Sequence, residues 1–138
     1  MSKSTATQGP RHARPLSPHL TVYKPTPTMT MSIIHRITGG ALYVGTLLVA
    51  WWLIATSISP DYFDYVSWLF GTWIGRLVLF GYTWALMQHM LGGIRHFIWD
   101  TGMGLEKHTA TKLAWATLAG SIVLTILIWI AGYAARGM

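Results

Sequence analysis

The sequence predicts an all-α membrane protein with three transmembrane helices, and its composition and uncharged stretches carry that prediction. Of its 138 residues, 52% are hydrophobic and only 10% carry a formal charge, whereas soluble domains average about 25% charged residues. Three stretches lack formal charge, at residues 37–60, 77–94 and 113–135. Each is close to the length of about 20 residues that a membrane-spanning helix needs.

The chain divides into a polar N-terminal tail over residues 1–31 and a three-helix transmembrane unit over residues 32–138. The tail holds five prolines and shows neither helical nor strand periodicity. The three helices are expected at about 32–58, 74–99 and 112–135.

The middle helix is the least obvious of the three. Its uncharged stretch is only 18 residues long, but Arg76 and Arg95 can belong to the span because long basic side chains snorkel to the membrane interface. Residues 61–70 are expected to form a short aromatic loop or an interfacial helix. Residues 101–111, with two glycines, form the second connection.

The basic residues are distributed asymmetrically around these spans. Eight of ten precede the first helix or surround the second connection, so this side is expected to be cytoplasmic, with the N-terminus inside and the C-terminus outside. Nucleic-acid binding is excluded because the cations lie at segment ends rather than on one face. The absence of Cys excludes thiolate zinc sites and Cys-ligated iron–sulfur clusters. The eight residues are Lys3, Arg11, Arg14, Lys24, Arg36, Arg95, Lys107 and Lys112.

His89 is an ionisable residue inside an expected span, and such residues are functional candidates. Gly92 and Gly93 share its helical face and leave room for a flat group. A neutral imidazole is a good haem iron ligand. The alternative is that His89 hydrogen-bonds to a neighbouring helix and the glycines permit close helix packing. A rise of about 1.5 Å per residue places His89 about 9 Å from the cytoplasmic end of its helix.

Ser32 and Arg36 are four residues apart at the start of the first span and lie on one helical face. Both are hydrogen-bond donors, and together they can hold a carbonyl oxygen of a quinone. The alternative is an N-cap for Ser32 and a positive-inside anchor for Arg36. His35, between them, either contacts a haem propionate or faces the membrane interface.

The order of two motifs identifies a family resemblance. Ser32-Ile33-Ile34-His35-Arg36-Ile37-Thr38-Gly39 is followed by His89, Gly93-Ile94-Arg95-His96 and Asp100, and both are preceded by Arg14-Pro15-Leu16-Ser17-Pro18-His19-Leu20 with Tyr23. This pattern resembles the cytochrome b membrane-anchor subunits of succinate dehydrogenase, complex II, of the alphaproteobacterial and mitochondrial type. One departure is Phe97-Ile98-Trp99, where the family usually has Leu or Met.

The resemblance implies a set of residue roles in a heteromeric helix bundle. His89 becomes an axial ligand of the iron of haem b, and a companion anchor subunit supplies the second axial His. Ser32 and Arg36 become contacts of ubiquinone, and His35 and Arg36 lie near the haem propionates. Arg95 and His96 lie near the face that docks the iron–sulfur subunit.

The function implied is that of a membrane anchor in the tricarboxylic acid cycle and respiratory electron transport. The chain is not catalytic on its own, since it carries no dinucleotide fingerprint and no Cys cluster. Its expected partners are a flavoprotein subunit, an iron–sulfur subunit, a second membrane-anchor subunit and the lipid membrane.

Three alternatives stay open at this point. One is the anchor of a quinol:fumarate reductase, because sequence does not reveal the redox direction. Another is a small transporter or channel using His89 and Arg36, and a third is a purely structural anchor without cofactor. Since residue 1 is Met and no Arg- and Ser-rich presequence follows, the expected location is the bacterial inner membrane rather than the mitochondrial one.

Overall fold

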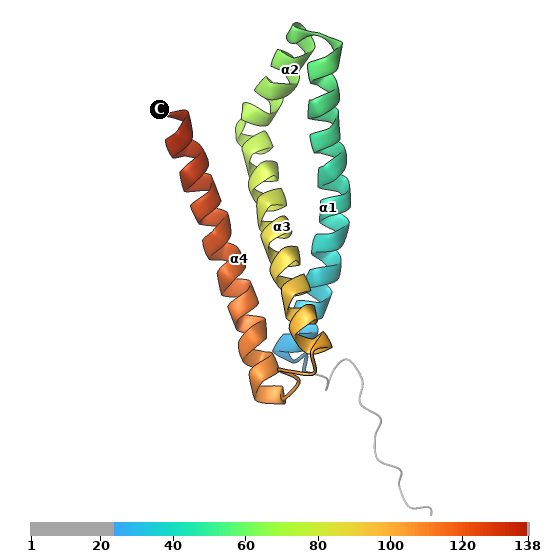
Figure 1. Cartoon of the computed structure of the whole chain (residues 1–138). Coiled ribbons are helices and arrows are strands. Elements are labelled where there is room, and N and C mark those ends of the chain that lie inside the picture. Colours follow the sequence, from blue (N-terminus) through green and yellow to red (C-terminus); the bar gives the residue numbers. More distant parts are fainter. Residues whose placement is uncertain (1–23, 138) are drawn as a thin grey trace, which may run out of the picture.

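The computed structural model describes residues 24–137, and these form four helices (Figure 1). α1 (Pro27–Ile58) runs the length of the molecule, and α2 (Pro60–Gly71) turns back at its far end. α3 (Trp73–Asp100) then returns antiparallel to α1, and α4 (Lys107–Arg136) runs antiparallel to α3. α3 packs against both α1 and α4, so it is the central helix of the chain.

Hydroxyl side chains set where the first three helices begin. Thr26 accepts a hydrogen bond from the backbone N–H of Met29, Ser59 from that of Tyr62, and Thr72 from that of Gly75. Proline follows Thr26 and Ser59 at the first helical position, where no backbone donor is needed. Ser59 and Thr72 each end one helix and cap the next, which is why these connections are single residues.

The caps explain where the structure differs from the expected boundaries. α1 begins at residue 27 rather than 32, because the Thr-Pro pair starts the helix inside the expected tail. Residues 61–70 lie in a full helix, α2, so of the two forms expected for this segment the helix is the correct one and the loop is wrong. α4 begins at residue 107 rather than 112. Most of the expected tail, including the motif at 14–20, lies outside the described residues.

The connection between α3 and α4 depends on two glycines. Gly102 and Gly104 have φ angles of +79° and +73°, a region that side chains with a Cβ rarely adopt. The indole N–H of Trp99 donates to the carbonyl of Gly104 at 3.2 Å. The chain therefore reverses within a few residues, and the end of α3 lies beside the start of α4.

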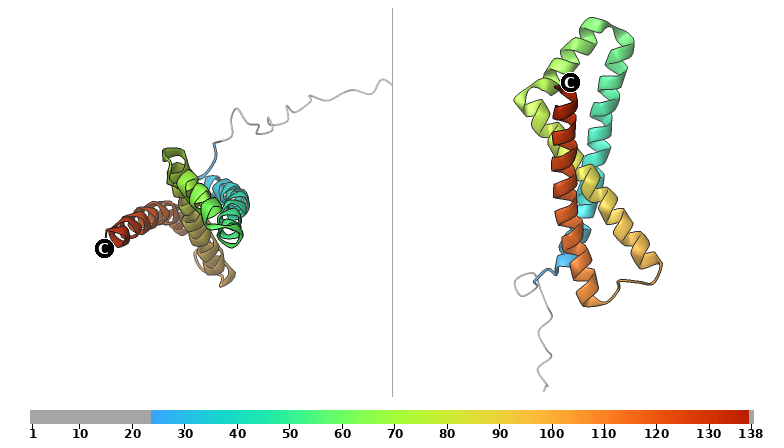
Figure 2. Two further views of the ribbon diagram at one scale, coloured as in Figure 1. Left: turned by 90° about the horizontal axis from the view of Figure 1, so that it is seen from above. Right: turned by 60° about the vertical axis from the view of Figure 1, so that its left-hand side comes forward.

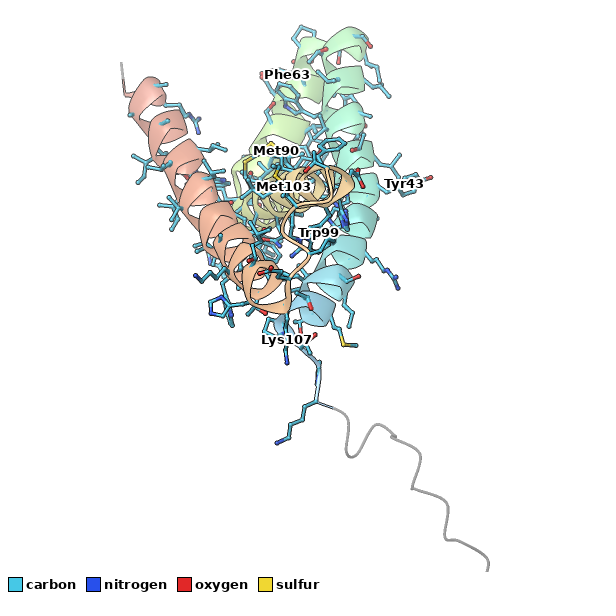
Figure 3. All side chains as sticks on the ribbon, turned by 60° about the horizontal axis from the view of Figure 1, so that its bottom comes forward. Tyr43, Phe63, Met90, Trp99, Met103 and Lys107 are labelled. Carbon is cyan, nitrogen blue, oxygen red and sulfur yellow. The ribbon has the colours of Figure 1, made fainter. Side chains whose placement is uncertain are left out.

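Small side chains fill the helix interfaces and large apolar side chains point outward. The buried positions include Gly45, Ala55, Ala85 and Ala114, and the ring of Tyr82 lies against the backbone of Gly45. In contrast, Tyr43 is 73% exposed and projects away from the other helices (Figure 3). This arrangement is typical of helices that associate in lipid, where close backbone approach rather than burial of large side chains drives packing.

Two of the four helices, α1 and α4, are long and apolar enough to cross a membrane. The described residues do not confirm the expected third span by the same measure. α3 has 28 residues, or about 42 Å of helix, but its polar side chains lower its hydropathy. Gln88 and Arg95 among them are buried inside the chain.

The bundle is closed at one end and open at the other. Seen along and across the helices, α4 leaves α3 progressively toward its C-terminus (Figures 1 and 2). At the open end, Trp51 and Trp52 of α1 donate indole hydrogen bonds to Tyr62 and Ser67 of α2. These bonds hold α2 against α1. Toward the opposite end the start of α1 packs against the second half of α3, and the last turns of α3 lead away from α1 before the connection to α4 (Figure 2).

Candidate functional site

Three histidines meet where the start of α1 packs against the second half of α3. The imidazole rings of His35 and His89 are stacked, with centroids 4.0 Å apart and planes inclined by 6°. The ring of His96 is tilted by 59° at 5.3 Å from that of His35. His35 is therefore the centre of this histidine cluster, which we define as His35, His89 and His96.

Hydrogen bonds determine which nitrogen of His89 is free. Its Nδ1 lies 3.2 Å from the backbone oxygen of His35 and 3.3 Å from the hydroxyl of Thr38. The Thr38 hydroxyl itself donates to the same backbone oxygen at 3.0 Å. Because a carbonyl oxygen only accepts, the Nδ1 of His89 carries the hydrogen, and its Nε2 keeps a lone pair for a metal. Such a carbonyl contact is the usual way in which a metal-binding His is oriented.

Two glycines allow the rings to stack. A Cβ on Gly92 would lie 2.5 Å from Nδ1 of His35, and a Cβ on Gly39 would lie 3.2 Å from Cε1 of His89. The expectation that Gly92 leaves room for a flat macrocycle is therefore wrong, because the imidazole of His35 fills that space. Gly93 and Gly40 have no atom within 4 Å of an added Cβ, so the open surface lies there instead.

Several buried polar atoms around the cluster have no hydrogen-bond partner among residues 24–137. They are Nδ1 of His35, Oε1 of Gln88, and Nε and Nη1 of Arg95. Arg95 is only 2% exposed, and its guanidinium carbon lies 5.0 Å from the ring centroid of Trp99. Leaving such groups unpaired is costly, so they indicate that a group from outside the described residues completes the site.

Ser32 and Arg36 lie on the outside of α1, next to the cluster rather than in it. Both side chains are exposed, and neither has a hydrogen-bond or ion-pair partner in the part of the chain that the structure describes. His35, between them in the sequence, turns toward α3. The shared face of Ser32 and Arg36 is thus free to meet a molecule or a second chain.

The residues fit a haem better than a bare metal ion. Within residues 24–137 no three His, Asp or Glu side chains are arranged to hold a metal ion, whereas haem iron can be held with a single histidine from this chain. Nε2 of His89 suits the iron, and the open surface at Gly93 suits an apolar macrocycle. The cations Arg36 and Arg95 suit anionic propionates.

Sequence reasoning missed two members of the site. Thr38 is buried and contacts His89, and the available signal was its position three residues after His35, on the same helical face. Gln88 is 1% exposed and its amide nitrogen lies 3.7 Å from the sulfur of Met31. The sequence signal that could have identified Gln88 was a polar amide in the middle of an expected span.

Comparison with known proteins supports the same interpretation. The family of succinate dehydrogenase/fumarate reductase transmembrane subunits matches residues 10–128. The succinate dehydrogenase cytochrome b556 subunit of Paracoccus denitrificans is 46% identical over 117 residues, which cover 85% of this chain and 90% of that protein. The cytochrome b556 subunit of Rickettsia conorii is 37% identical over 117 residues, covering 85% and 91%.

A mitochondrial relative matches as well. The succinate dehydrogenase cytochrome b560 subunit of Mus musculus is 35% identical over 118 residues, which cover 83% of this chain and 66% of that protein. The matched residues include both motifs that carry the resemblance in the sequence, so that resemblance is confirmed.

Proposed function

The chain belongs to the family of succinate dehydrogenase/fumarate reductase transmembrane subunits, and on that premise we propose that it is the cytochrome b anchor of a succinate:ubiquinone oxidoreductase. It holds a flavoprotein and an iron–sulfur subunit to a bacterial inner membrane together with a second anchor subunit. The relatives compared above are named for succinate dehydrogenase, which favours this direction of electron flow over fumarate reduction.

One observation carries the proposal that His89 ligates haem b. Nδ1 of His89 is engaged by the backbone oxygen of His35, so Nε2 is the nitrogen left for the iron. When bound, the haem supplies a one-electron carrier inside the membrane. The chain's own residues would hold and orient it: Thr38 and the His35 carbonyl set the His89 tautomer, and a histidine of the companion subunit would complete the iron's ligands.

Ser32 and Arg36 bind the ubiquinone in this proposal. Their exposed side chains offer a hydroxyl and a guanidinium one helical turn apart, and hydrogen bonds from both polarise a quinone carbonyl oxygen toward reduction. They lie in the first turns of α1, near the end of the bundle that carries Lys107 (Figure 3). A quinone there is within reach of electrons from a soluble iron–sulfur subunit on the cytoplasmic side.

The haem assignment is tested on the purified complex by spectroscopy. In His89→Leu, we expect loss of the sharp α band after dithionite reduction and loss of the low-spin bis-histidine electron paramagnetic signal. His96→Leu is the matched control, because it removes a histidine of the same cluster and should keep both signals. Succinate oxidation with a phenazine acceptor confirms assembly. An unchanged paramagnetic signal in His89→Leu would assign the iron to another residue.

The topology proposed has three spans with the N-terminus in the cytoplasm, and α3 is the middle span. Its 28 residues are long enough to cross, and Arg76 lies in its first turn, where a basic side chain can reach the interface. Reporter fusions at residues 59, 108 and 138 test this. We expect the outer compartment at 59 and 138 and the cytoplasm at 108. The same compartment at 59 and 108 rejects α3 as a span.

A further inference from the structure

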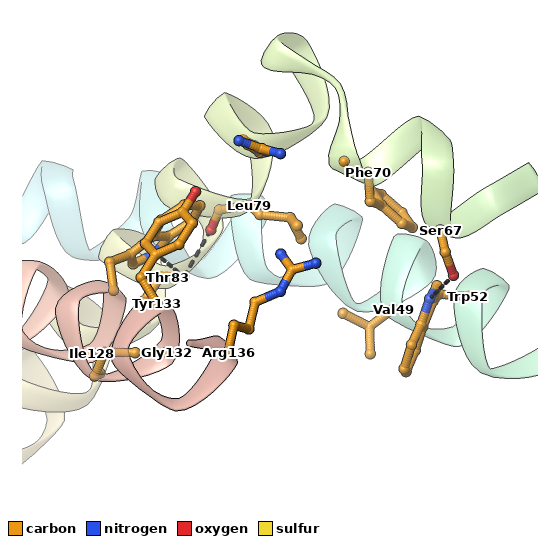
Figure 4. Close-up of a pocket in the computed structure, with 13 residues that line it drawn as sticks. Val49, Trp52, Ser67, Phe70, Leu79, Thr83, Ile128, Gly132, Tyr133 and Arg136 are labelled. Atoms are coloured by element: carbon orange, nitrogen blue, oxygen red, sulfur yellow. Dashed lines mark hydrogen bonds between the residues drawn. The ribbon is translucent and has the colours of Figure 1, made fainter. Parts of the chain in front are cut away.

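A second polar site lies at the open end of the bundle, far from the histidine cluster. A pocket of about 630 Å³ is formed there by α3, α4 and the adjoining ends of α1 and α2 (Figure 4). It lies where α4 diverges from α3 (Figures 1 and 2). The haem and quinone roles proposed above use none of its lining residues.

Two arginines line this pocket, one from each of two antiparallel helices. Arg76 is in the first turn of α3 and Arg136 is the last residue of α4. Because the helices are antiparallel, these positions come to the same end of the molecule and hence to the same depth in a membrane. Figure 4 shows the side chain of Arg136 extending from α4 toward Leu79 on α3.

Neither arginine has a counter-ion within residues 24–137. No ion pair or side-chain hydrogen bond involves either guanidinium in the described chain. Asp61 and Asp64 occur on α2 at this end of the molecule but do not line the pocket. Two cations that face one cavity repel each other, so an anion in the cavity is favoured.

The remaining wall of the pocket is mostly apolar. The indole N–H of Trp52 donates to Ser67 at 3.1 Å and that of Trp129 donates to Thr83 at 3.2 Å (Figure 4). Since these N–H groups are satisfied inside the chain, both indoles present hydrocarbon to the pocket. Phe70, Leu79 and Ile128 extend this surface.

The geometry points to an anionic glycerophospholipid of the outer leaflet, with its phosphate between Arg76 and Arg136 and its acyl chains along the apolar wall. Guanidinium groups bind phosphate in a bidentate manner, and basic pockets between membrane helices suit such headgroups. A neutral quinone would leave both cations unpaired, and a free phosphate ion would leave the apolar wall without a partner. This inference rests on the proposed function in one respect, that α3 and α4 both span the membrane.

The test uses the purified, delipidated complex and native mass spectrometry. The complex is titrated with dioleoylphosphatidylglycerol, and dioleoylphosphatidylcholine serves as the zwitterionic comparison. We expect Arg76→Gln/Arg136→Gln to weaken phosphatidylglycerol binding about tenfold, as expected for loss of bidentate phosphate contacts. Lys107→Gln/Lys112→Gln removes the same net charge at the other end of the bundle and should change nothing.

A second pair of variants keeps both charges and asks whether the pocket itself is occupied. A Cβ on Gly132, which lines the pocket, or on Gly81, which does not, would meet no atom within 4 Å. Gly132→Leu should therefore reduce phosphatidylglycerol binding, whereas Gly81→Leu should not. Both variants are expected to assemble, so this comparison stands even if the double arginine variant does not.

Four results would overturn the inference. They are unchanged phosphatidylglycerol affinity in the arginine and Gly132 variants, equal loss in the lysine control, equal wild-type affinity for the two lipids, and complete competition by millimolar inorganic phosphate, which would indicate a free phosphate site. The haem α band is recorded in the same samples. A wild-type complex without that band but with arginine-dependent lipid binding would reject the proposed haem role and leave this inference standing.

Discussion

The two ends of this helix bundle hold their polar side chains in different ways. At the histidine end, glycines let imidazoles pack directly against backbone, and the rings of His35 and His89 lie 4.0 Å apart. At the arginine end, α4 leaves α3, and Arg76 and Arg136 border a pocket with apolar walls. At one end His35 and His89 are thus half-buried in a helix contact, whereas at the other end the two arginines are exposed.

This difference between the histidine end and the arginine end shows how one small membrane chain can bind partners of different kinds. An enclosed histidine has its tautomer set by a backbone carbonyl and is ready to hold one atom in a defined direction. An open pair of cations sets no single geometry and suits a flexible headgroup. We therefore expect disruption of the His35–His89 stack to abolish haem binding, whereas substitutions at the second end should have graded effects.

The largest expected effect is that of Gly92→Leu, which breaks the enclosed end. Because an added Cβ already lies within 2.5 Å of His35, the larger side chain should separate the His35 and His89 rings and abolish haem incorporation. Gly93→Leu is the control, since no atom of the described chain lies within 4 Å of a Cβ added at Gly93. Haem content per complex is the measurement, and equal haem content in both variants would show that the stack is dispensable.

A smaller effect is expected beside the cluster, at Arg36 and Ser32. Loss of one hydrogen bond to the quinone costs about 0.5 to 1.5 kcal/mol, and more for a charged donor. Ser32→Ala should therefore slow quinone reduction several-fold, and Arg36→Leu should slow it further. Phenazine-linked succinate oxidation, which bypasses the quinone, should survive in Ser32→Ala. If both activities fall together in assembled complex, Ser32 acts on assembly or on an earlier transfer step.

A graded effect is expected where α4 is held to α3 near the open end. Trp129→Phe removes the indole bond to Thr83 but keeps most of the aromatic wall. Interhelical hydrogen bonds in membranes average about 0.6 kcal/mol, so the thermal midpoint of the complex should fall only slightly. The haem spectrum should not change. A spectral change would mean that the two ends of the bundle are coupled and do not act independently.

The smallest effect is expected from Thr38→Val, which tests whether the Thr38 hydroxyl or the His35 carbonyl orients His89. The substitution removes one hydroxyl near Nδ1 of His89 but keeps the backbone oxygen of His35 as its acceptor. Haem should remain bound, and the paramagnetic signal should shift rather than vanish. Complete haem loss would assign the orientation of His89 to Thr38 rather than to the carbonyl.

Much of the helical layout could be predicted from the sequence because it depends on local chemistry. Uncharged stretches of about 20 residues mark helices for a membrane. The boundaries moved where a Thr-Pro pair started α1 at residue 27, where Ser59 with Pro60 started α2, and at α4, which begins at residue 107 rather than 112. The family was also readable, because the spacing of His, Arg and Gly in two motifs is a property of the chain alone.

Tertiary structure decided which of those residues meet. The stack of His35 on His89 joins positions 54 residues apart, and it depends on how two helix faces approach, which no local pattern encodes. Because α1 and α3 approach in this way, the imidazole of His35 fills the space at Gly92, where the sequence predicted room for a macrocycle. The pocket between Arg76 and Arg136 exists because antiparallel helices bring the start of α3 to the end of α4 and then diverge. Helix formation follows from neighbours in the chain, whereas helix packing follows from surfaces that meet only after folding.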